Sequence, residues 1–181
     1  WIASQYRRYV KNGGKQLFDE FIDLKEDKGA WKQKDLYFYP MLKFVQESFN
    51  KPPLVLFHDD LKAHPEKFLE RIANYTKTTF SIHEIDLTPK HSSYSTKQLL
   101  FARKYIPFDK AKELKTKNRA LHYINYRSKW LINHLLLYVA LLLPDKFYKE
   151  ELVSKSHMEA VKDYYLEDWL KCVEFANKYS A

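Results

Sequence analysis

The chain has 181 residues, of which 45% are apolar and 17% aromatic, and it carries a formal net charge of +8. This composition excludes a disordered chain and is typical of one folded domain with a sizeable core. The excess of Lys and Arg favours anionic partners, such as phosphate or sulfate groups. Cys172 is the one cysteine, so an internal disulfide is excluded. We expect either a reducing, cytoplasmic environment or a fold that is indifferent to redox conditions.

The glycines and histidines exclude further classes of protein. The three glycines, Gly13, Gly14 and Gly29, form neither a G-x-x-x-x-G-K-[ST] nor a G-x-G-x-x-G motif. The seven histidines are scattered, and no pair stands four residues apart with an acidic partner. The sequence therefore predicts no metal site.

The first third of the chain shows helical periodicity. Ile2, Tyr6, Tyr9 and Val10 share one face of a helix that should end at Gly13–Gly14. A second short amphipathic helix is expected over 17–22, then a charged loop over 25–35. A third helix should begin near residue 40, where a proline suits the first helical turn.

The pattern then changes to a continuous apolar run over Leu54–Phe57, directly after two prolines. Such a run is typical of a strand buried on both faces of a parallel sheet. A helix beginning near Pro65 follows, and this order of elements predicts a piece of an α/β fold. Because the backbone of a lone strand needs partners, we expect the other strands in a longer protein of which this chain is the C-terminal part.

The rest of the chain is expected to be mostly helical. Ser95 and Gln98 form a capping box that predicts the start of a helix. A further helical region over 117–181 should be interrupted near Leu143–Pro144. The apolar run over 130–144 is too short to cross a bilayer, so we expect no transmembrane segment. Contact of residues 130–143 with an oligomeric partner or with a membrane surface remains open.

Two stretches in this order resemble the sulfotransferase superfamily. "SQYRRYVKNGG…LFDEFI" is followed by "LVLFHDDLKAHPEKFLERIANYT", and the later "HSSYSTKQLLFARKY" is similar to a segment of bacterial-type members. The likeness covers about residues 1–105, although the family more often has Glu where this chain has Asp59. It implies a P-loop-NTPase-like α/β fold with a parallel sheet, of which residues 1–181 would be the C-terminal part of a single domain. It also implies transfer of a sulfuryl group from PAPS (phosphoadenosine phosphosulfate) to an acceptor hydroxyl, with a carbohydrate as one candidate acceptor.

The resemblance also implies where the donor would bind. Ser4 matches the serine that contacts the 3′-phosphate of PAPS, and Tyr6 matches a packing tyrosine. In the loop expected over the nucleotide, Lys90, His91 and Ser93 carry groups that suit a phosphate or adenine contact. The partner arginine, the phosphosulfate-binding loop and the catalytic base are expected before residue 1, so no catalytic residue is assigned.

Other polar residues near these segments have simpler interpretations. Asp59 and Asp60 are adjacent and point different ways, so we expect a capping role rather than a catalytic pair. His58 is interpreted as structural. Arg103 is expected to form a structural ion pair, while Arg7 and Arg8 face either solvent or an anionic ligand.

Two alternative functions stay open at this stage. One is a nucleotide kinase of related fold. The other is a basic helical module that binds nucleic acid without sequence preference. Its tract comprises Lys110, Lys112, Lys115, Lys117, Arg119, Arg127 and Lys129, with Tyr123 and Tyr126 between them. The sulfotransferase interpretation expects a small-molecule acceptor, no nucleic acid and no metal.

Overall fold

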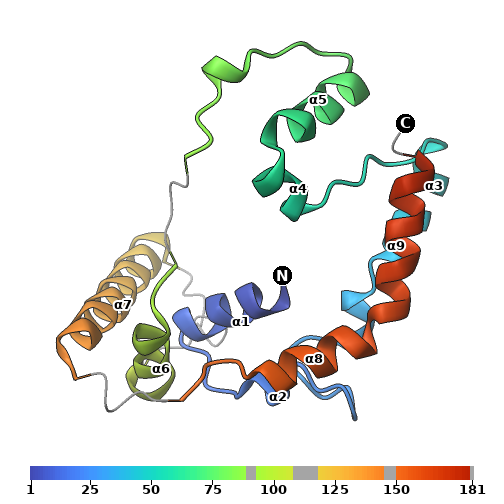
Figure 1. The fold of residues 1–181 in the computed structure, drawn as a ribbon. Coiled ribbons are helices and arrows are strands. Elements are labelled where there is room, and N and C mark those ends of the chain that lie inside the picture. The colour runs from blue at the N-terminus through green and yellow to red at the C-terminus, as the bar shows by residue number, and fades with distance from the viewer. Residues whose placement is uncertain (89–92, 108–117, 145–149, 180–181) are drawn as a thin grey trace. The chain divides into compact units, whose positions relative to one another are not determined.

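A computed structural model describes residues 1–88, 93–107, 118–144 and 150–179 (Figure 1). Throughout these ranges the regular structure is helical, and no strand is present. The chain divides into two compact units. The first unit comprises Trp1–Gln33 and Ser92–Val161, and the second comprises Lys34–His91 and Lys162–Ala181.

The predicted α/β fold with a parallel, P-loop-NTPase-like sheet is wrong for the described residues. Residues 54–57 have no regular structure and are only half-buried. Val55 packs against the apolar cluster of the second unit, and the Phe57 ring lies 5.2 Å from that of Trp169. The guanidinium of Arg71 donates to the Val55 carbonyl oxygen at 3.1 Å. Helices therefore supply the contacts of the half-buried apolar run that seemed to require a sheet, and the expectation of partner strands elsewhere loses its basis.

Helix α1 (Ile2–Lys11) confirms the first predicted helix and buries Ile2, Tyr6 and Val10. Its end depends on glycine, because a Cβ atom on Gly14 would lie 2.3 Å from the Tyr9 ring. The short helix α2 (Phe18–Phe21) follows and is also confirmed. An isolated bridge then joins Ile22 to Trp31.

Helices α6 (Thr96–Tyr105) and α7 (Arg119–Val139) pack together in the same unit (Figure 1). The predicted capping box is confirmed, since Ser95 Oγ accepts from Gln98 N and Gln98 Oε1 accepts from Ser95 N. Gln98 Nε2 also donates to the Leu137 carbonyl oxygen at 3.0 Å, which links the two helices. The predicted break is confirmed as well, because α7 continues only through a 3-10 turn, η4 (Ala140–Leu142). Helix α8 (Lys155–Tyr164) follows.

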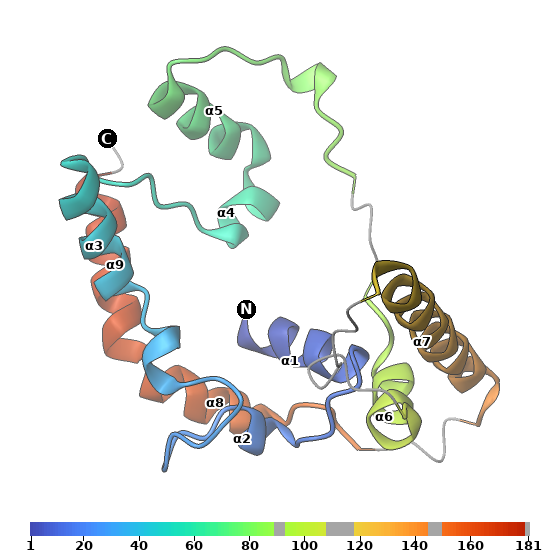
Figure 2. The same ribbon diagram turned by 180° about the vertical axis from the view of Figure 1, so that it is seen from behind.

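In the second unit, η1 (Gln33–Leu36) leads into α3 (Tyr39–Phe49), which lies beside α9 (Leu166–Tyr179) in both views (Figures 1 and 2). Their interface contains Leu42, Cys172 and Phe175. The buried Asp168 carboxylate of α9 accepts hydrogen bonds from the backbone N–H groups of Phe38 and Tyr39, where α3 begins.

Helices α4 (His58–Ala63) and α5 (Pro65–Thr76) follow, with the predicted proline in the first turn of α5, and then η2 (Ile82–Glu84). Asp59 and Asp60 lie in the first turn of α4, where a carboxylate interacts favourably with the helix dipole, but neither makes a capping hydrogen bond. Asp60 instead pairs with Arg71 at 3.5 Å. Within the described ranges, no helix combines the length and the apolar character needed to cross a membrane.

Candidate anion-binding site

One face of α1 carries a hydroxyl and three cations. Ser4, Arg7, Arg8 and Lys11 follow the i, i+3, i+4, i+7 spacing, which places their side chains along one side of the helix. The opposite side is the buried stripe that anchors α1. The helix contains no Asp or Glu. We call these four residues the α1 basic face.

The segment before α6 lies against this face. The Arg7 guanidinium donates a hydrogen bond to the carbonyl oxygen of Tyr94. The Lys11 ammonium lies 5.2 Å from the centroid of the Tyr94 ring, close enough for a cation–π contact. Burial raises the pKa of the Tyr94 phenol, with a smaller contribution from Tyr138. Arg7 and Lys11 are therefore partly covered, and their charges are held in place.

The other two members of the α1 basic face are exposed. Ser4 and Arg8 lie four residues apart, one turn of the helix, so their side chains are neighbours. A hydroxyl that donates one hydrogen bond and a guanidinium that donates two parallel ones suit the oxygens of a phosphate or sulfate. The arrangement can hold a small anion, and the two covered cations raise the potential around it.

Among the predicted donor-binding residues, the structure places Ser4 on this exposed face. Ser93 is exposed and adjoins Tyr94, so its segment is brought to α1. Lys90 and His91 lie outside the described residues. The contact through Tyr94 had no signal in the sequence, because it joins positions far apart along the chain.

Tyr6 fixes α1 on the side opposite the α1 basic face. It is fully buried, and its ring meets those of Phe18 and Phe21 at 5.3 and 5.2 Å. Its hydroxyl donates to the Gln16 carbonyl oxygen at 2.9 Å and accepts from Arg103 Nη1 at 3.4 Å. Burial raises the pKa of Tyr6 despite the opposing effect of the guanidinium. The Tyr9 ring also meets that of Phe21, at 4.9 Å, so both tyrosines pack α1 on α2.

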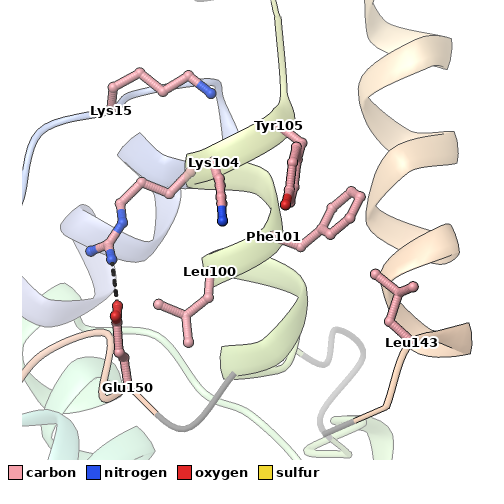
Figure 3. Close-up of a pocket in the computed structure, with 8 residues that line it drawn as sticks. Lys15, Leu100, Phe101, Lys104, Tyr105, Leu143 and Glu150 are labelled. Atoms are coloured by element: carbon pink, nitrogen blue, oxygen red, sulfur yellow. Dashed lines mark hydrogen bonds and ion pairs between the residues drawn. The ribbon is translucent and has the colours of Figure 1, made fainter. Parts of the chain in front are cut away.

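A pocket of about 660 Å³ adjoins α6 (Figure 3). Arg103 pairs there with Glu150 at 3.3 Å, which confirms the predicted ion pair and is drawn as the dashed line. Lys15 and Lys104 add two further cations to the wall, and Lys15 Nζ donates to the Ala102 carbonyl oxygen at 3.3 Å. The apolar part of the lining comprises Leu100, Phe101, Tyr105 and Leu143. Nothing near Lys15 in the sequence indicates a contact with α6, so this pocket was not predicted.

The structure also describes several of the other polar residues that the sequence analysis singled out. His58 and Asp59 are exposed on α4. Within the described ranges, no group of three or more His, Cys, Asp or Glu side chains could hold a metal ion. Of the basic tract considered for nucleic acid, residues 110–117 lie outside the described part, while Arg127 stacks over Trp130 on α7.

Comparisons of the chain with protein-family models, with curated proteins and with solved structures found no match.

Proposed function

We propose that this chain binds PAPS through the 3′-phosphate of the nucleotide and serves a sulfotransferase that moves the sulfuryl group to an acceptor hydroxyl. The observation that carries the proposal is the α1 basic face, on which an exposed serine and three cations lie together. The resemblance of the N-terminal stretch to sulfotransferases supplies the identity of the anion. No sheet is needed for this role, because α1 is fixed by its aromatic contacts with α2.

The charges on this face suit a phosphate monoester. Such a group carries close to two negative charges at neutral pH, and a charge-assisted hydrogen bond contributes roughly twice as much as a neutral one. Ser4 and Arg8 would contact the phosphate oxygens directly. Arg7 and Lys11 would contribute through their charge, since both already contact Tyr94.

Sulfuryl transfer depends chiefly on positioning and on stabilising the charge spread over the transferred group. We assign donor positioning to the α1 basic face and assign no catalytic base. Arg103, next to the anchor Tyr6 and paired with Glu150, stabilises the environment of α1 rather than contacting the donor.

Calorimetric titration with adenosine 3′,5′-bisphosphate and with adenosine 5′-phosphate tests the proposal. We expect the first nucleotide to bind at least about tenfold more tightly, because only it carries the 3′-phosphate. Arg8→Gln should reduce this preference. Lys67→Gln, which removes an exposed cation from α5, is the matched control and should leave it unchanged.

Equal affinity for the two nucleotides would contradict the proposal. Competition with a single-stranded oligonucleotide tests the alternative that the chain binds nucleic acid. If the oligonucleotide binds far more tightly than the bisphosphate and Arg8→Gln weakens both equally, the α1 basic face is a general polyanion surface and not a donor site.

A further inference from the structure

Helix α7 exposes an apolar stripe that is interrupted only at Ser128. The side chains follow the i, i+3, i+4, i+7 pattern of one helical face, which η4 extends by one residue. The stripe comprises Leu121, Ile124, Leu131, Leu135, Tyr138 and Leu142, all of them more than half exposed. We call it the α7 stripe. An apolar surface of this length on one helix marks an interaction site.

The stripe is not the side on which α7 packs. Asn133 and Leu137 are the buried residues of the helix, and Gln98 fastens the Leu137 carbonyl oxygen to α6. On a helix of 3.6 residues per turn, these positions lie on the side away from Ile124 and Leu135. One face of α7 is therefore buried within the fold, and the opposite, apolar face is exposed to solvent.

The charged residues of α7 are all cations, and η4 carries no charge. Residues 118–144 contain no Asp or Glu. Of the three cations on α7, Arg119 and Lys129 lie about 140° around the helix from the centre of the stripe, and Arg127 borders it. Arg127 lies one turn from both Ile124 and Leu131, at the edge of the stripe. From α6, Lys97 donates to the Leu141 carbonyl oxygen at 3.2 Å, which adds a second cation near the end of the stripe.

We propose that the α7 stripe lies flat on the surface of a membrane that contains anionic lipids. A helix with an apolar face flanked by Lys and Arg buries that face at the boundary between headgroups and acyl chains. Each cation near an anionic leaflet strengthens such binding by attraction to the lipid headgroups. The tyrosine in the stripe also suits the interface, where aromatic rings with a polar tip are favoured.

Self-association through the same face fits the charges less well. A symmetric dimer would place the same patch of each copy against the other. Such a dimer would bring Arg127 of each copy to the edge of the contact, with no carboxylate on α7 or η4 to pair with either. An anionic lipid surface supplies the missing negative charge.

Sedimentation of the full chain with vesicles tests this inference. We expect binding to vesicles of phosphatidylcholine with one quarter phosphatidylserine, and at least about tenfold weaker binding to phosphatidylcholine alone. Leu135→Glu should reduce binding to the anionic vesicles about tenfold or more. The matched control is Leu170→Glu, which changes an equally exposed leucine on α9 and should bind as the unchanged chain does.

Arg8→Gln tests whether the α1 basic face, rather than the α7 stripe, binds the vesicles. We expect this variant to retain full binding. Circular dichroism checks that each variant keeps its helices, and Leu131→Glu replaces Leu135→Glu if that variant does not fold. Absence of binding to anionic vesicles would overturn the inference. An equal loss with Leu170→Glu, or a dimer in vesicle-free solution that Leu135→Glu dissociates, would overturn it too.

Discussion

The Arg7 guanidinium donates a hydrogen bond to the Tyr94 carbonyl oxygen across 87 positions of sequence. This contact joins α1 to the segment that carries Ser93, with Lys11 over the Tyr94 ring as a second contact. Two of the segments with predicted donor-binding residues are thereby held together. The site depends on this long-range contact as much as on the helix itself.

Replacement of Arg7 should loosen the segment around Tyr94. Arg7→Gln removes the donor to Tyr94, and loss of one hydrogen bond costs about 1 kcal/mol. We therefore expect amide hydrogen exchange around residues 93–95 to become several-fold faster. Arg8→Gln, which leaves the contact intact, is the control. Unchanged exchange in the Arg7 variant would mean that other contacts fix the segment.

A buried carboxylate should stabilise the second unit. Asp168 Oδ2 accepts from Phe38 N at 2.8 Å, and Asp168 Oδ1 accepts from Tyr39 N at 3.1 Å. Asp168→Ala would leave both N–H groups without this acceptor, so we expect the free energy of unfolding to fall by about 1–3 kcal/mol. Asp168→Asn should lose less, because one oxygen remains. Denaturant titration measures both variants, and an equal change in Glu174→Ala, at an exposed position of α9, would refute the assignment.

The Cys172 thiol should react slowly. Burial, together with the nearby Asp168 carboxylate, raises the pKa of Cys172 from 9.0 to about 11. Below pH 9 a shift of this size lowers the thiolate fraction about a hundredfold. We expect alkylation by iodoacetamide at pH 8 to be at least that much slower in the folded chain than in urea. Equal rates in the two states would show that the thiol is accessible.

The raised pKa of Cys172 makes the stability of the fold depend on pH above pH 9. The unfolded chain releases the thiol proton near pH 9.0, whereas the folded chain retains it until about pH 11. The contribution of this group is therefore fully present below pH 9 and declines as the pH rises through that window. Cys172→Ala should show a shallower loss of stability between pH 9 and 11 than the unchanged chain.

Local signals predicted the helices well. The end of α1 at Gly13–Gly14 and the capping box of Ser95 and Gln98 depend on residues within one or two turns of each other, so the sequence alone contains the information. The same spacing places Ser4, Arg7 and Arg8 on one face. These parts of the fold and of the candidate site could be predicted without a structure.

The parts of the fold and of the candidate site that could not be predicted depend on long-range contacts. A four-residue apolar run such as 54–57 fits a buried strand or any other buried segment, and periodicity does not separate the two. Its partner Trp169 lies more than 100 positions away, and nothing near residue 54 indicates it. Asp168 likewise resembles an ordinary acidic residue in the first turn of a helix until α3 is placed beside it. The pairing of Arg7 with Tyr94 was hidden for the same reason.

The most direct measurement is the effect of Ser4→Ala on the binding of adenosine 3′,5′-bisphosphate, with adenosine 5′-phosphate as the reference ligand. Loss of a hydrogen bond to a charged phosphate costs about 1.5–3 kcal/mol, which corresponds to a roughly ten- to hundredfold weaker affinity. We expect that loss for the bisphosphate, almost none for the monophosphate, and none for either ligand in Ser48→Ala, an exposed serine on α3. Equal losses for both nucleotides, or no loss for either, would contradict the assignment of Ser4 to the 3′-phosphate.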